Sequence, residues 1–100
     1  MAPIPTYSID LSLSDDATAQ EVTCTVNCQE TVNGSSTLAD YTLTAVAKDA
    51  DGQSTTLNAV NGVIEYGSLG IGTYTITVTA VCDKDAATVA TESIEVTVTI

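Results

Sequence analysis

The chain alternates between apolar and polar residues over most of its length. Between residues 72 and 82 every second residue is apolar, and the residues between them are mostly threonines. Successive side chains of a β-strand point to opposite faces, so this pattern is typical of a strand with one buried face. Comparable patterns predict seven strands, over residues 7–13, 21–28, 39–47, 54–60, 63–67, 72–82 and 92–100.

Turn residues separate these segments. Asn33-Gly34 marks one turn, and Asn61-Gly62 is typical of a tight two-residue hairpin. Short strands at this spacing predict an all-β fold, an antiparallel β-sandwich of about seven strands. Residues 86–91 fit either a loop or an early start of the last strand.

The length and composition fit one domain with an aliphatic core. One hundred residues are enough for a single core, and we assign residues 7–100 to one domain. The chain has no Phe, no Trp and four Tyr, so its core must consist of Val, Ile, Leu, Ala and Tyr. Pro3 and Pro5 cannot donate ladder hydrogen bonds, so residues 1–6 are predicted to form an extended arm.

The charge balance narrows the possible partners. Thirteen acidic residues face two lysines, and the net charge is −11. Such a surface repels nucleic acid and anionic membranes. The acids either keep a β-domain soluble or attract a cation or a basic partner. No apolar run is long enough to insert into a membrane.

The N-terminus carries no signal-peptide pattern. Residues 1–6 contain neither a basic region nor the start of an apolar one. We therefore expect either a complete protein made for the cytoplasm or a domain from a longer exported protein.

One segment carries a family resemblance. The sequence Leu69-Gly-Ile-Gly-Thr-Tyr-Thr-Ile-Thr-Val-Thr-Ala80 resembles the sixth strand of bacterial and phage immunoglobulin-like and PKD-like domains. The resemblance implies an immunoglobulin-like sandwich in which Tyr74 forms a tyrosine corner, with its hydroxyl bonded to nearby backbone. The chain departs from antibody domains, since it has no Trp and has Ile76 where the partner of Cys24 would stand. The PKD signature is absent from the third and fourth strands.

The residues argue against catalysis. The chain has no His, so the usual Ser-His and Cys-His nucleophile pairs are excluded. Lys48 and Lys84 fall in predicted loops, where a buried base is not expected. Paired carboxylates could perform acid–base chemistry, but a sandwich of this size offers no obvious cleft. We expect a protein that is not an enzyme and has no cofactor.

The three cysteines leave two possibilities open. Cys24 and Cys28 lie four residues apart on one strand, about 13 Å at ~3.3 Å per residue, which is too far for a disulfide. In the strand order that the resemblance implies, Cys28 and Cys82 end parallel strands of opposing sheets, so a disulfide between them is possible. The alternative is that all three are reduced core residues.

The acidic residues suggest one metal hypothesis. In the implied strand order Asp15, Asp16, Asp49 and Asp51 fall at the same end of the sandwich. Asp49, Asp51 and Gly52 have the spacing of a calcium loop without its later Glu. The same residues are also ordinary turn residues, so a Ca²⁺ site and plain turns are both kept.

Two function classes follow. The first is a structural, protein-binding accessory that decorates a phage virion, at its capsid or tail, or a similar assembly. The second is a stalk or ligand-binding module of a bacterial surface adhesin or carbohydrate-active protein, located at the cell surface or outside the cell. In both, the threonine rows form either a solvated sheet face or a flat docking surface, and an edge strand could also add to a partner sheet.

Overall fold

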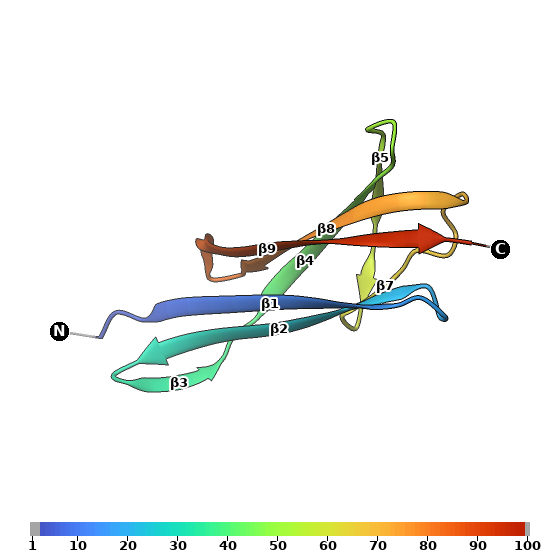
Figure 1. The fold of residues 1–100 in the computed structure, drawn as a ribbon. Helices are drawn as coiled ribbons and strands as arrows, with labels where there is room; N and C mark the ends of the chain where they lie inside the picture. The colour runs from blue at the N-terminus through green and yellow to red at the C-terminus, as the bar shows by residue number, and fades with distance from the viewer. Residues whose placement is uncertain (1–2, 100) are drawn as a thin grey trace.

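The computed structural model describes residues 3–99 and is built from strands alone. They form two antiparallel sheets, an arrangement consistent with a β-sandwich (Figure 1). Within residues 3–99 no helix is long and apolar enough to cross a membrane. The strands are β1 (Thr6–Asp16), β2 (Glu21–Val32), β3 (Ser35–Leu38), β4 (Tyr41–Lys48), β5 (Ser54–Leu57), β6 (Ala59–Val60), β7 (Val63–Glu65), β8 (Gly72–Cys82) and β9 (Asp85–Val98).

Each sheet has a defined strand order. The first, here called sheet A, has the order β1-β2-β7-β6, with β3 paired to the far end of β2. The second, sheet B, has the order β5-β4-β8-β9. The molecule is elongated, with extents of 59 × 25 × 16 Å. The β1–β2 and β8–β9 hairpins run along its length (Figure 1), and β4 pairs antiparallel with β8 from Tyr41 to Lys48.

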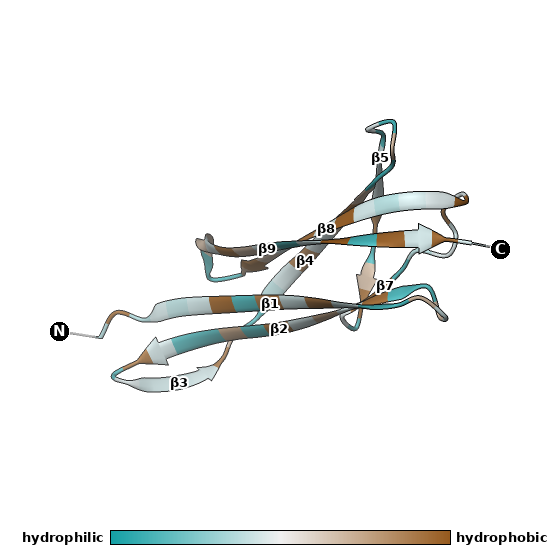
Figure 2. Cartoon of the chain, viewed as in Figure 1, coloured by the Kyte–Doolittle hydropathy of each residue, from teal (hydrophilic) through white to brown (hydrophobic). Residues whose placement is uncertain are grey.

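The core forms where the apolar sides of the two sheets meet. The predicted alternation is visible toward the end of β9, where brown and paler residues alternate in Figure 2. Ile76 and Val78 of β8 are fully buried, and Val26 of β2 packs against the same core from the other sheet. The core is aliphatic, as expected, and also contains Cys24 and Tyr66.

The predicted strand over residues 54–60 is wrong as a single unit. Residues 54–57 form β5 and pair with β4 in sheet B, whereas Ala59 and Val60 form β6 and pair with β7 in sheet A. The chain changes sheets at Asn58. Leu57 and Ala59 flank Asn58, and both are partly buried against the core. Apolar alternation continues through the change, which is why the pattern predicts one strand.

Other boundaries also differ from the prediction. The last strand begins at Asp85, so residues 86–91 belong to β9 and not to a loop. A short strand, β3, occupies residues that we predicted as turn and connection. Of the predicted arm over residues 1–6, residues 3–5 precede β1, Thr6 already belongs to β1, and residues 1 and 2 lie outside the described range. Residue 100, the predicted end of the last strand, also lies outside it.

Both Asn-Gly pairs form the turns that the sequence predicts. Asn61 and Gly62 have φ values of 53° and 77°, and the flanking Val60 and Val63 are paired. Asn33-Gly34 has nearly the same values, 51° and 79°, between β2 and β3. Two consecutive positive φ angles are characteristic of the two-residue hairpin turn whose twist matches the strands it connects.

The two glycines should respond differently to substitution. Both need a positive φ, so we expect Gly34→Ala to lower the free energy of unfolding by about 1 kcal/mol. A Cβ on Gly62 would in addition lie 3.0 Å from the carbonyl oxygen of Cys24, whereas nothing lies within 4 Å of a Cβ on Gly34. Gly62→Ala should therefore cost roughly 1 kcal/mol more than Gly34→Ala. Urea denaturation of the two variants measures this difference, and equal losses would contradict the close approach.

Candidate functional site

The outer side of sheet B is lined by hydroxyl groups. The register aligns Thr44 of β4, Thr79 of β8 and Thr91 of β9 across the sheet, and neighbouring rows repeat the arrangement. These residues alternate with the buried ones, so they face away from the core. We call this surface the hydroxyl face; its members are Thr42, Thr44, Ser54, Thr56, Thr73, Thr75, Thr77, Thr79, Thr91, Ser93 and Thr97.

Cross-strand contacts between hydroxyls help to order this surface. The hydroxyls of Thr77 and Ser93 lie 2.9 Å apart, and those of Thr73 and Thr97 lie 3.4 Å apart. Both pairs join β8 to β9. Hydrogen bonds between threonine and threonine or serine on adjacent strands stabilise a sheet.

The hydroxyl face carries little charge on a strongly acidic chain. One row contains both signs, with Lys48 and Glu95 on either side of Thr75. The other non-hydroxyl residues that point outward from these strands are Val46, Val81 and Val89, of which Val89 is 47% exposed. At one end of the face the hydroxyl of Thr42 donates to the carboxylate of Asp83 at 2.6 Å. Since the chain as a whole has a net charge of −11, its charge lies mostly elsewhere.

The outer side of sheet A has a different character. Asp16, Glu21 and Glu65 occupy one row across β1, β2 and β7, and Asp10 lies further along β1. Three acids in adjacent positions repel one another and attract cations. The two sides of the sandwich are therefore electrostatically unlike.

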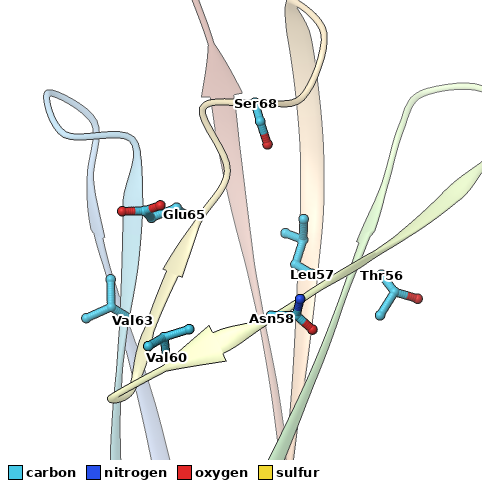
Figure 3. A pocket seen from close by; sticks show the side chains of 7 residues that line it. All are labelled: Thr56, Leu57, Asn58, Val60, Val63, Glu65 and Ser68. Atoms are coloured by element: carbon cyan, nitrogen blue, oxygen red, sulfur yellow. The ribbon is translucent and has the colours of Figure 1, made fainter.

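A groove opens along the flank where the chain changes sheets. It has a volume of about 520 Å³. Figure 3 shows its lining, in which Leu57 and Val60 come from the two sides of the change and Glu65 contributes the acidic group. The remaining lining residues are Thr56, Asn58, Val63 and Ser68. The groove could accommodate a small ligand or one side chain of a partner.

Two of the four aspartates of the calcium hypothesis, Asp16 and Asp49, bond the backbone of their own turns. The Oδ1 atom of Asp16 accepts the backbone N–H groups of Thr18 and Ala19, both at 3.1 Å. The Oδ1 atom of Asp49 accepts those of Asp51 and Gln53, both at 2.9 Å. Nowhere in the described chain do three or more carboxylate or thiol groups gather as metal ligands would. Asp16 and Asp49 thus bond within their own turns, and the carboxylate of Asp15 accepts the hydroxyl of Tyr66 instead.

The tyrosines form three hydrogen bonds that join distant segments or close a loop. The hydroxyl of Tyr74 donates to the backbone carbonyl of Gly70 at 2.7 Å, which is the bond that the resemblance leads us to expect. The hydroxyl of Tyr66 donates to Asp15 at 2.6 Å, and that of Tyr7 donates to Glu30 at 2.7 Å. Sequence analysis missed the last two bonds, because no local pattern relates residues so far apart.

The hydrogen bonds to carboxylates change the acidity of two tyrosines. Burial, followed by the hydrogen bond to Asp15, raises the pKa of Tyr66 to about 12. The hydrogen bond to Glu30 is the main cause that raises the pKa of Tyr7 to about 12. Both phenols therefore stay neutral at ordinary pH and act as donors.

Two of the three cysteines meet between the sheets. The thiol of Cys28 on β2 points to the sulfur of Cys82 on β8, with 3.4 Å between the Sγ atoms. All three cysteines are free and buried. Burial and the hydrogen bond with Cys82 raise the pKa of Cys28 to about 11, and burial raises that of Cys24.

Comparisons with known proteins give no relative from which a role could be transferred. No protein-family model matches the chain, and no curated protein or solved structure matches it.

Proposed function

We propose that this chain is a non-enzymatic structural protein, an immunoglobulin-like accessory that decorates a phage virion or a similar assembly. It would bind a protein partner of that assembly through the hydroxyl face of sheet B. Neither nucleic acid nor a membrane interior suits its charge and composition.

The strand order supports the immunoglobulin-like part of the proposal. One sheet has the order β1-β2-β7-β6 and the other has the order β5-β4-β8-β9. Of the seven strands predicted from the sequence, the first, second and fifth (β1, β2 and β7) therefore share one sheet, and the third, sixth and seventh (β4, β8 and β9) share the other. This division is the one found in immunoglobulin-like sandwiches. The bond from Tyr74 to Gly70 near the start of β8 is in keeping with it.

The low charge of the hydroxyl face is the observation that best supports docking. Interface centres are depleted in charged residues relative to the rest of a protein surface. On this chain Lys48 and Glu95 offset each other on the hydroxyl face and Asp83 adjoins one end of it. On the other side of the sandwich Asp16, Glu21 and Glu65 form a row of acids with no positive charge in it. The acidic remainder would keep the free protein soluble and monomeric.

A single charge placed on the hydroxyl face should disrupt binding. Thr44 is exposed on an inner strand of sheet B, and Thr44→Glu would add an unpaired charge to the interface. We expect this change to weaken binding about tenfold or more. Thr25→Glu is the matched control, because Thr25 is an exposed threonine on an inner strand of sheet A.

The measurement is co-sedimentation of the purified protein with two preparations. One is purified phage virions and the other is bacterial cell envelopes. The proposal predicts saturable binding to virions that Thr44→Glu weakens and Thr25→Glu leaves unchanged. Equal effects of the two variants would rule out the hydroxyl face as the docking surface. No binding to virions at micromolar concentration would contradict the accessory role itself.

The alternative is an immunoglobulin-like stalk or ligand-binding module of a bacterial surface adhesin or carbohydrate-active protein. The groove at the change of sheets favours it, since its volume of about 520 Å³ suits a small ligand. Binding to envelopes alone, weakened by a charge in the groove such as Val60→Asp, would support this alternative.

A further inference from the structure

The cysteine pair between the sheets has the arrangement of a cross-link that has not formed. Cys28 lies within β2 of sheet A, and Cys82 is the last residue of β8 in sheet B. Their Sγ atoms are 3.4 Å apart, and a disulfide bond would bring them about 1.4 Å closer. Cys24, the third cysteine, lies on β2 like Cys28, but its thiol packs into the main core. The geometry therefore selects one pair out of three.

We propose that Cys28 and Cys82 form a disulfide between the two sheets when the chain passes through its unfolded state with a small-molecule disulfide oxidant present. In the folded state the same two thiols are shielded from that oxidant. The redox state of the pair would then depend on whether such an oxidant was present while the chain folded.

The reaction is a pair of thiol–disulfide exchanges with a disulfide such as oxidised glutathione. The thiolate of one cysteine attacks a glutathione sulfur, the glutathione S–S bond breaks, and one glutathione thiolate leaves. The thiolate of the second cysteine then attacks the protein sulfur of the mixed disulfide and displaces the second glutathione. The protein loses two electrons, the oxidant gains them, and the two thiol protons end on the two released glutathiones.

Burial explains why the folded dithiol is shielded. Cys28 is 2% exposed and Cys82 is 1% exposed, so an oxidant of the size of glutathione cannot reach either sulfur. The thiolate is the attacking form, and burial, with the hydrogen bond to Cys82, raises the pKa of Cys28 to about 11. The titratable groups that face this thiol are Cys82, Asp83 and Asp40, and each disfavours a negative charge on it. The unfolded chain has none of these constraints.

The test compares one redox buffer at two urea concentrations. Reduced protein is incubated with reduced and oxidised glutathione either without urea or near the urea midpoint, where unfolded chains form continuously. Samples are then quenched, alkylated in denaturant and mapped by mass spectrometry without reduction. We expect the Cys28–Cys82 link to accumulate near the midpoint, with Cys24 alkylated, and to form about 100-fold more slowly without urea.

A stability measurement supplies the second readout. The link closes a loop across a sequence separation of 54 residues, so the oxidised protein should melt about 10 °C higher than the reduced protein. Cys24→Ala is the matched control, because it removes the third buried thiol and should leave the link unchanged. Cys82→Ser should leave Cys28 as a free thiol or a glutathione adduct.

Several results would overturn the proposal. These are a link that involves Cys24, glutathione adducts on Cys28 and Cys82 without closure, equal rates with and without urea, or an oxidised form that melts below the reduced one. The peptide maps and melting temperatures of the chain without substitutions decide between these outcomes even if Cys82→Ser does not fold.

Discussion

Replacing Tyr66 by Ala is expected to lower the free energy of unfolding by about 3–5 kcal/mol, the range for deletion of a large buried aromatic side chain. Tyr66 is the largest of the fully buried side chains, with an exposure of 0%. It follows β7 and packs in the core cluster between the sheets, while its hydroxyl bonds to Asp15 at the end of β1. The substitution therefore removes core volume and a link between two strands of sheet A.

Two further variants separate these contributions. Tyr66→Phe removes the hydroxyl alone and should cost about 0.5–1.5 kcal/mol, the usual contribution of one hydrogen bond. Tyr41→Ala is the exposed control, because Tyr41 is 40% exposed, and its cost should stay well below that of Tyr66→Ala. Urea denaturation gives all three values. A loss for Tyr66→Ala no larger than that for Tyr41→Ala would mean that Tyr66 does not hold the core.

The free energy of unfolding should fall under alkaline conditions. The folded protein holds the phenolic proton of Tyr66 up to a pKa of about 12 and the thiol proton of Cys28 up to a pKa of about 11. In the unfolded chain these protons dissociate near pH 10 and near pH 8.5–9, respectively. Between these values the unfolded state binds fewer protons, so stability falls as pH rises.

The size of this effect follows from the pKa values. Stability should be constant up to about pH 8 and decline from there to about pH 12, with a loss of about 2–3 kcal/mol from Tyr66 alone. Urea midpoints measured at intervals between pH 7 and pH 11.5 test the decline. Tyr66→Phe is the control, because it should be less stable at neutral pH but lose less as pH rises. A parallel decline in both proteins would show that Tyr66 does not contribute.

The regular parts of the fold are predictable because period-two alternation reports directly on strand faces. The prediction of β8 over residues 72–82 is confirmed to both ends, and the central residues of β1, β2 and β4 are also as predicted. The turn at Asn61-Gly62 is predictable for a local reason, since two positive φ angles need those residue types.

The irregular parts depend on information that alternation does not contain. The pattern states which side chains face inward but not which sheet they face from, so the change of sheets at Asn58 leaves no trace in it. For the same reason the alternation predicts neither the groove along that flank nor the hydrogen bond between Tyr66 and Asp15. The low charge of the hydroxyl face can be predicted from the sequence, because the alternation shows which threonines point outward and that Glu95 lies among them.

The passage of the chain from β5 to β6 at Asn58 restricts how one sheet can move against the other. On that flank a continuous backbone runs from sheet B into sheet A, so sliding would have to stretch covalent bonds. On the opposite flank the edge strands β1 and β9 lie against each other, and no hydrogen-bonded ladder joins them within residues 3–99. At Asn58 the chain itself therefore fixes the spacing of the two sheets, whereas the described parts of β1 and β9 are held together without a ladder.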